Sequence, residues 1–319
     1  GVHTATWMAT GLQDLFSRHL ATDWLQRTGE WEMWQAVHSM HPAELWETHA
    51  VQKNAFLEFV RCQRSRQLRR ENAPDAAIDA ARKAFDPGVL TICWGGELTR
   101  ENQLQLLFAD EDRLARILRD ETRPVQLIIA GRVRSGDEWG TQLASRLHKL
   151  QTDPGFDGRM LLLEDFDLGI CRHLVQGADV WLNITEVSWP ACGRTGQMAA
   201  LNGGLNLSVL SGWWAESYGG GNGFAIGTGM THAVQEVAQA RDAESLYTAL
   251  EQQVVPMYYD RDVDDLPRKW IKMMMNAFST LAWRISSDRM LLEYTHQVYQ
   301  PVATRSAGPS PAGLGRPRD

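Results

Sequence analysis

From residue 88 onward the sequence alternates short apolar runs with longer amphipathic segments. The apolar runs, which we expect to be strands, are residues 89–94, 125–130, 160–163, 180–182 and 205–209. The expected helices are residues 104–119, 137–150, 167–176 and a segment that begins near Thr195. Such alternation predicts an α/β fold, a doubly wound and mainly parallel sheet with helices on both faces. Ligands of these sheets bind beyond the carboxyl ends of the strands.

Helical extensions flank this alternating region. We expect residues 1–87 to be a helical lead-in, because residues 43–72 carry apolar side chains at helical spacing on a charged background. Residues 88–302 are expected to form one Rossmann-like domain that ends in closing helices. Residues 303–319 are rich in Pro, Gly and Ser and predict a disordered tail. The closing helices are expected at residues 243–254 and 267–286.

The composition argues against several classes of function. The net charge of -7 disfavours a nucleic-acid partner, because phosphate binding needs clustered Lys and Arg. No apolar run approaches the roughly 20 residues that a membrane-spanning helix needs. The four cysteines lack the paired spacing of a zinc site or a disulfide framework, so we expect reduced thiols and a cytoplasmic protein. Lysine is scarce, and none of the five lysines falls in a strand-to-helix turn: Lys53, Lys83, Lys149, Lys269 and Lys272.

Residues 179–227 contain the most informative motif. A short strand is followed by a glycine-containing turn, a helix start, a second strand and a loop rich in Trp and Gly. Free N–H groups at a helix start suit a phosphate or a carboxylate, and glycine lets a ligand approach the backbone closely. A loose glycine motif is a weak signal, however, and a purely structural turn is the preferred interpretation of these residues alone. The turn consists of Ala191, Cys192, Gly193, Arg194, Thr195 and Gly196.

This motif resembles the signature of the bacterial glycogen/α-glucan phosphorylases. In that family the helix start carries a lysine that holds pyridoxal phosphate as a Schiff base, in a pattern close to Glu-Ala-Ser/Cys-Gly-Thr-Ser-Gly-Met-Lys-Ala-Ala-Leu-Asn-Gly. Residues 190–203 here read PACGRTGQMAALNG, so that Met198 occupies the lysine position and Pro190 the acidic position. Other segments match the family in the same order along nearly the whole chain except the tail: residues 1–7, 44–47, 124–131, 163–165, 176–183, 254–267 and 289–294.

The resemblance implies a GT-B glycosyltransferase, of which this chain would supply the C-terminal Rossmann-like domain. The family reaction is phosphorolysis of α-1,4-glucan to glucose 1-phosphate in carbohydrate metabolism. The turn at residues 191–196 would then be an ancestral phosphate or sugar site. The phosphate-binding residues are also replaced: residues 95–103 stand where the family has a cationic loop and contain one Arg and two Glu, while Glu186 and Val187 stand at basic positions. A phosphate dianion would meet repulsion there instead of charge-assisted hydrogen bonds.

We therefore expect no cofactor in this chain, and a phosphorylase-like half that is not itself a competent phosphorylase. Two alternatives remain open. One is a GT-B glycosyltransferase with another sugar donor, completed by a separate N-terminal partner; the other is a non-catalytic glucan-binding module. The expected ligands are an α-glucan or a sugar phosphate, and the expected partner is the missing N-terminal domain or a second copy. Residues 1–34 are rich in Trp, so we expect this segment to be loose or to self-associate.

Three other groups of residues are weaker candidates for function. Trp213 and Glu216 are candidate sugar contacts, because aromatic faces stack on pyranose rings, although a packed Trp corner is the preferred interpretation. His148 and His173 are expected to be surface or core histidines without metal-like partners. The acidic run at residues 260–265 has intervals near those of an EF-hand but lacks its Gly and closing Glu. We expect a solvated acidic loop and no metal site.

Overall fold

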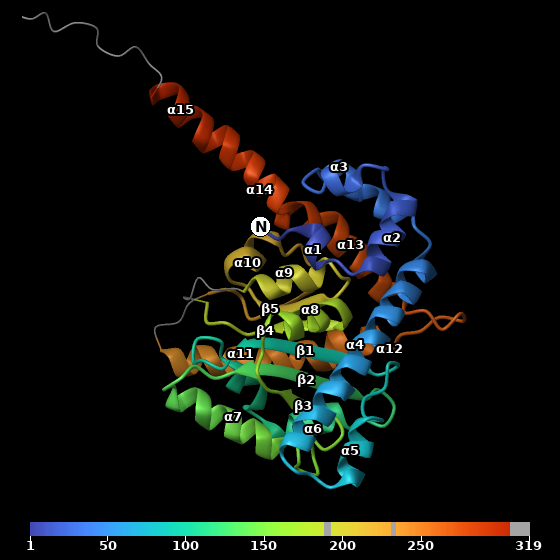
Figure 1. Cartoon of the computed structure of the whole chain (residues 1–319), viewed down its shortest axis with the longest axis vertical. Helices are drawn as coiled ribbons and strands as arrows, with labels where there is room; N and C mark the ends of the chain where they lie inside the picture. Colours follow the sequence, from blue (N-terminus) through green and yellow to red (C-terminus); the bar gives the residue numbers. More distant parts are fainter. Residues whose placement is uncertain (188–192, 231–233, 307–319) are drawn as a thin grey trace, which may run out of the picture.

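A six-stranded parallel sheet forms the centre of the computed structural model, which describes residues 1–187, 193–230 and 234–306 (Figure 1). The strand order is β3-β2-β1-β4-β5-β6, so that the direction of strand addition reverses between β1 and β4. The expected α/β, doubly wound fold is therefore confirmed. The strands are β1 (Leu90–Glu97), β2 (Val125–Arg132), β3 (Met160–Leu163), β4 (Val180–Asn183), β5 (Leu205–Val209) and β6 (Phe224–Ile226).

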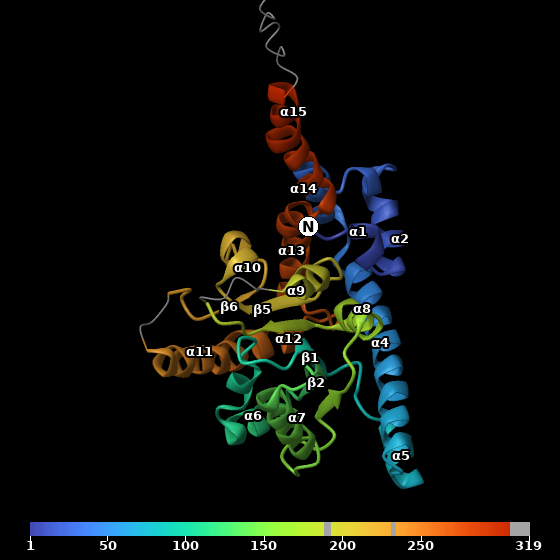
Figure 2. The same cartoon turned by 60° about the vertical axis from the view of Figure 1, so that its left-hand side comes forward.

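Helices cover both faces of this sheet. Figure 2 shows α8 and α9 on one side, with α6, α7 and α11 on the other. The strands are buried on both faces, which explains the continuous apolar sequence of β3 and the mostly apolar one of β2. In β5 the polar residues Asn206 and Ser208 alternate with apolar ones and are buried as well. The helices are η3 (Leu104–Phe108), α6 (Glu111–Leu118), α7 (Glu138–Leu150), α8 (Leu168–Gly177), α9 (Arg194–Ala200), α10 (Gly212–Ser217) and α11 (Gln235–Ala249).

Aspartate side chains fix where three of these helices begin. Asp110, Asp137 and Asp167 each accept a hydrogen bond from the backbone N–H three residues further on, at 2.7–3.0 Å. Such caps satisfy N–H groups that have no partner inside the helix. The expected single helix over residues 104–119 is wrong for this reason, because Asp110 starts a new helix, α6, after the short helix η3.

The first 81 residues form helices that pack against the domain: α1 (Thr4–Trp7), α2 (Thr10–His19), η1 (Trp24–Gln26), α3 (Trp31–Trp34), η2 (Gln35–Ser39), α4 (Pro42–Arg70) and α5 (Asp75–Ala81). Phe16, Trp24 and Trp34 are buried and meet edge to face, with ring centroids 5.6–6.0 Å apart. The expectation that residues 1–34 are loose is therefore wrong, because these aromatic rings form part of the core and do not cover the surface.

The last described helices leave the body of the molecule. Helix α13 (Arg268–Ile285) is mostly buried, whereas α14 (Ser287–Tyr294), η5 (Thr295–Tyr299) and α15 (Gln300–Ser306) extend outward as one rod (Figure 1). Residues 303–306 are thus helical, contrary to the expected tail, and residues 307–319 lie outside the described part. Between α11 and α13 lie η4 (Leu250–Val254) and α12 (Val255–Tyr259). Among the described residues, no helix combines the length and apolarity needed to cross a membrane.

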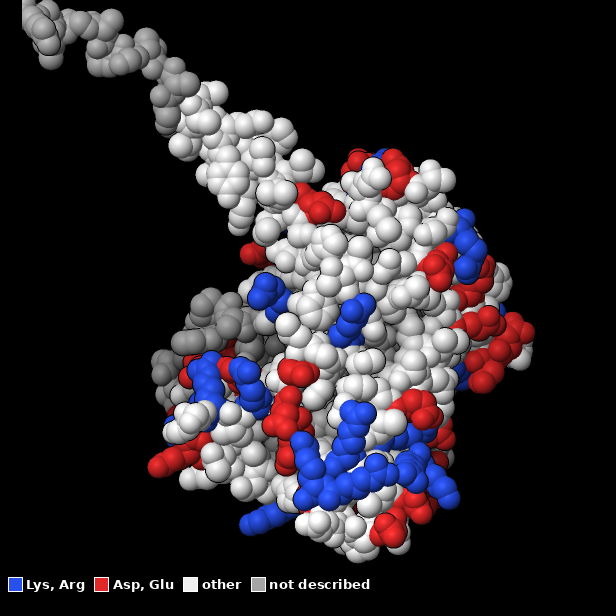
Figure 3. All heavy atoms as spheres, viewed as in Figure 1, with Lys and Arg blue, Asp and Glu red and all other residues white. Residues whose placement is uncertain are grey.

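Charged side chains are unevenly spread over the face seen in Figure 3. Lys and Arg gather on the lower part of this face with Asp and Glu beside them, whereas the outer part of the projecting rod shows no charged side chain on this face. Ion pairs join Arg61 to Glu58 and Arg64 to Glu71, so acidic residues balance part of the arginine-rich end of α4. Residues 294–304 of the rod contain no Lys, Arg, Asp or Glu.

Candidate functional site

A cavity of about 550 Å³ opens at the carboxyl ends of β1 and β4, where the strand order reverses. This is the position at which doubly wound sheets bind their ligands. Gly95 and Gly96 at the end of β1 and Asn183 at the end of β4 line its floor, and the first turn of α9 lines its wall. We call it the strand-end cavity. Its aromatic lining residues are Trp7, Trp94, Phe166 and Trp181.

Met198 lines the strand-end cavity from α9 and is 8% exposed. Its thioether cannot form a Schiff base, and none of the described lining residues is a lysine. Lys53 is a buried lysine, but it lies at the opposite end of the sheet. Its Nζ donates to Val89 O at 2.7 Å and to Asp179 Oδ2 at 2.5 Å, and both residues precede their strands. The structure therefore places no described amine where the family pattern has one.

Two arginines at or beside the strand-end cavity, Arg132 and Arg134, are engaged with an acid, and Arg194 is a further cation of the lining. Glu97 Oε1 accepts a hydrogen bond from Arg132 Nη2 at 2.6 Å, and Glu97 Oε2 accepts one from Arg134 Nε at 2.7 Å. These two guanidinium groups, Arg134 foremost, hold the pKa of Glu97 below its usual range. Glu97 belongs to residues 95–103, the segment that the resemblance compares with the family's cationic loop. The Glu97 carboxylate neutralises the guanidinium of Arg132, which could otherwise bind a phosphate.

The glycine-containing turn is described from Gly193 onward; Pro190, Ala191 and Cys192 lie outside the described residues. Gly193, Arg194 and Thr195 line the strand-end cavity. Gly196 serves packing, because a Cβ there would lie 2.4 Å from Asn206 Oδ1. Asn206 Nδ2 donates to Gly196 O at 2.9 Å and so holds α9 against β5.

The Leu-Asn-Gly sequence after the turn has a structural role. Asn202 Oδ1 accepts a hydrogen bond from Ala9 N at 2.7 Å, and its Nδ2 donates to the carbonyls of Trp7 and Met198. These bonds tie α9 to the N-terminal segment. Asn202 therefore has a structural role that does not depend on the family's chemistry.

The two adjacent tryptophans have different environments. Trp214 is fully buried and its Nε1 donates to Phe224 O at 3.2 Å, as expected for a packed corner. Trp213 is half-buried and lines a second cavity of about 460 Å³ together with Glu216. Both candidate sugar contacts therefore line the same cavity. This cavity has no lining residue in common with the strand-end cavity.

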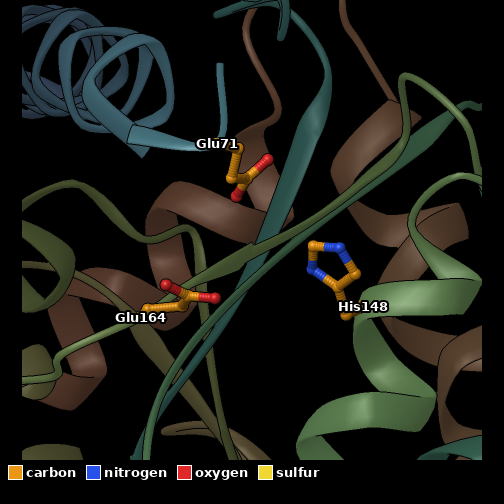
Figure 4. Close-up of side chains that lie close together, drawn as sticks. All are labelled: Glu71, His148 and Glu164. Atoms are coloured by element: carbon orange, nitrogen blue, oxygen red, sulfur yellow. The ribbon is translucent and has the colours of Figure 1, made fainter. Parts of the chain in front are cut away.

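A group of potential metal ligands lies near β3 (Figure 4). Glu71, His148 and Glu164 have ligand atoms within 4.8 Å of one another, so the expectation that His148 has no metal-like neighbour is wrong. Two of the three side chains already have a protein partner: Arg64 Nη1 lies 3.6 Å from Glu71 Oε1, and Gln151 Nε2 lies 3.2 Å from His148 Nδ1. We assign no metal to this group.

The remaining candidates have structural explanations. His173 stacks on Phe59 with centroids 3.9 Å apart, and burial lowers its pKa. In the acidic loop, Asp262 accepts hydrogen bonds from Leu266 N and Asp264 N and pairs with Arg268. The loop is thus organised by its own backbone and by a neighbouring cation.

A buried ionic cluster is the feature that sequence analysis missed. Lys53 and Asp179 are 2% and 0% exposed, and Asp179 Oδ1 also lies 2.9 Å from His49 Nε2. Burial opposes ionisation of Asp179, but Lys53 and His49 outweigh it and hold its pKa below the usual range. The sequence signal for this cluster was a single lysine, Lys53, beside Phe56 on the apolar face of α4.

Comparisons with known proteins agree with this geometry. The chain is 34% identical to "Glycogen phosphorylase" of Aquifex aeolicus over 302 residues, covering 95% of this chain and 43% of that protein. It is 35% identical to "Glycogen phosphorylase" of Mycobacterium tuberculosis over 97% of this chain and 36% of that protein. It is 33% identical to "Maltodextrin phosphorylase" of Thermococcus litoralis over 94% of this chain and 35% of that protein. No family model matches the chain.

The chain belongs to the glycogen phosphorylase family. The match falls in the C-terminal portion of these relatives, so the chain spans less than half of their length. The resemblance stated from the turn motif is thereby confirmed.

Proposed function

We propose that this chain is a phosphorylase-like C-terminal half that does not catalyse pyridoxal-phosphate-dependent phosphorolysis. The observation that carries the proposal is Met198, buried in the wall of the strand-end cavity where the family pattern has its lysine. Schiff-base chemistry requires an amine in the pocket. The residues present do not fit the Schiff-base cofactor, because the described lining contains no lysine; of its two arginines, Arg132 and Arg194, Arg132 is paired with Glu97.

The test is release of glucose 1-phosphate from glycogen and inorganic phosphate with pyridoxal phosphate in excess. The Mycobacterium tuberculosis relative serves as the positive control. We expect no release by the wild-type chain or by Met198→Lys, because catalytic groups that act as a unit are strongly non-additive and several are replaced here. Release by the wild-type chain above that of a heat-treated sample would overturn the proposal.

A glycosyltransferase that uses another donor is the second candidate. The size of the strand-end cavity favours it, because about 550 Å³ lies within the usual range for a small-molecule site. Binding at 100 times the dissociation constant would stabilise the fold by about 2.7 kcal/mol. Thermal unfolding with UDP-glucose, ADP-glucose and glucose 1-phosphate distinguishes the candidates. A shift with a nucleotide sugar alone supports the transferase, and no shift with any of them argues against it.

A further inference from the structure

A third cavity, of about 630 Å³, opens at the carboxyl ends of β2 and β3 and is walled by α7. We call it the edge cavity, because β3 is an edge strand of the sheet. Its volume lies within the usual range for a small-molecule site. Of its lining residues, it shares only Arg132 with the strand-end cavity. Apolar side chains from separate parts of the fold contribute to the lining: Leu98, Val133, Ala144 and Leu162.

Opposite charges without partners line the edge cavity. Lys149, on α7, is exposed and forms no ion pair with a described residue. Glu164, which directly follows β3, is also exposed and accepts no hydrogen bond within the described ranges. The other charged pairs at this lining are already formed: Arg132 with Glu97, and Asp165 with Arg70. Among the described lining, one cation and one anion are therefore free to meet a ligand.

A second carboxylate, that of Glu71 at the end of α4, lies beside Glu164. Figure 4 shows Glu71, Glu164 and His148 pointing toward a common space, and their ligand atoms lie within 4.8 Å of one another. Two carboxylates this close repel each other unless a cation balances them. The cation beside Glu71 is Arg64, and its distance of 3.6 Å is longer than a hydrogen bond. The two carboxylates therefore favour a ligand that brings a positive charge.

The hydrogen bonds around His148 make this side chain a donor to the site. Gln151 Oε1 accepts a hydrogen bond from Leu162 N at 3.1 Å, which fixes the direction of the amide and turns its Nε2 toward His148 Nδ1. Because the amide nitrogen donates, Nδ1 accepts and the ring proton is assigned to Nε2. Nε2 in this tautomer does not ligate a metal, but it can donate to a carboxylate. Lys149 is the next residue on α7, so this helix offers two donors to the edge cavity.

We infer that the edge cavity binds a small zwitterion, an amino acid with an apolar side chain. The ammonium group of the ligand lies between Glu71 and Glu164, its carboxylate faces Lys149 and His148, and its side chain packs on the apolar lining. Charge-assisted hydrogen bonds of this kind are stronger than neutral ones. An amine without a carboxylate would leave Lys149 unpaired, and a carboxylate without an amine would be repelled by Glu71 and Glu164.

Calorimetric titration of the full chain with three ligands of similar shape tests the inference. L-phenylalanine carries both charges, 3-phenylpropionate carries only the carboxylate, and 2-phenylethylamine carries only the ammonium group. We expect saturable binding of L-phenylalanine and about tenfold weaker binding of each analogue; a tenfold change corresponds to 1.4 kcal/mol.

Two variants assign the charges to the two ends of the ligand. Glu164→Gln should weaken L-phenylalanine about tenfold without weakening 3-phenylpropionate, because it removes a partner of the ammonium group alone. Lys149→Gln should weaken L-phenylalanine by a similar factor without weakening 2-phenylethylamine. The matched control is Lys83→Gln, since Lys83 is exposed and does not line the edge cavity. Its affinity for L-phenylalanine should equal that of the wild type.

Several outcomes would overturn the inference. These are the absence of saturable heat with millimolar L-phenylalanine, unchanged affinity in both cavity variants, or an equal loss in Lys83→Gln. Binding of either analogue as tightly as L-phenylalanine would overturn the assignment to a zwitterion. None of these results bears on glucose 1-phosphate release, so the proposed function stands or falls separately.

Discussion

Replacement of Lys53 by Met should destabilise the fold strongly, because it leaves the buried carboxylate of Asp179 without its cation at the amino end of the sheet. Lys53 Nζ donates to Asp179 Oδ2, Val89 O and Tyr258 Oη at 2.5–3.0 Å. Methionine matches the volume of lysine but removes the cation. Removing one partner of a buried ion pair costs about 3–5 kcal/mol, mainly because the remaining charge is left uncompensated.

Urea unfolding followed by far-UV circular dichroism measures this cost. With an m-value of about 3 kcal/mol per molar, the midpoint should fall by about 1–1.7 M. The exposed Lys83 provides a matched control, since Lys83→Met should change stability by less than about 0.5 kcal/mol. The double variant Lys53→Met/Asp179→Asn should lose less unfolding free energy than the two single variants together, because Asp179→Asn removes the carboxylate charge that Lys53→Met leaves unpaired. A loss below about 1 kcal/mol in Lys53→Met would refute the reasoning and would leave Lys53 free for other roles.

Other predictions follow from burial, charge and exposed apolar surface. The pKa of Asp179 is lower in the folded state than in the unfolded state. Asp179 therefore stabilises the fold at pH values above its unfolded-state pKa, and this stabilisation is lost as pH falls through its folded-state pKa. Asp179→Asn should flatten the acid side of a plot of unfolding free energy against pH. Iodoacetamide at pH 8 should label Cys62 much faster than Cys171, whose pKa burial raises to about 11, and equal rates by peptide mapping would contradict this. The projecting rod should cause self-association, which light scattering over a concentration series should show, and Leu292→Glu with Val298→Glu should reduce it; a wild type that is monomeric throughout would contradict this. The rod's exposed apolar residues are Leu291, Leu292, Tyr294, Val298, Tyr299 and Val302.

The central sheet could be predicted from sequence because its strands are short apolar runs bounded by turn residues. Residues 160–163 and 205–209 coincide with β3 and β5 as observed. The small strand β6 and helix α10 were missed, since each is short and lies in a loop rich in Gly and Trp. The rod was missed because its Ser, Gly and Pro neighbours beyond Ser306 dominate the local composition.

The site could be predicted only where a local motif carried it. The motif at residues 190–203 drew attention to Met198, which lines the strand-end cavity, because a turn from a strand to a helix lies at the carboxyl edge of a parallel sheet. The pairing of Glu97 with Arg132 joins two neighbouring strands, and the second cavity, lined by Trp213 and Glu216, joins α9, α10 and α13. Both depend on tertiary contacts that no spacing along the chain encodes.

Reductive trapping with pyridoxal phosphate tests the central claim most directly. The chain is incubated with the cofactor, reduced with borohydride and mapped by peptide mass spectrometry, with the Mycobacterium tuberculosis relative treated in parallel. The account predicts no stoichiometric, saturable label on any lysine, because Met198 has no amine and Lys53 is buried at the other end of the sheet. One equivalent of label on a single lysine, abolished by a ligand of the strand-end cavity, would contradict it.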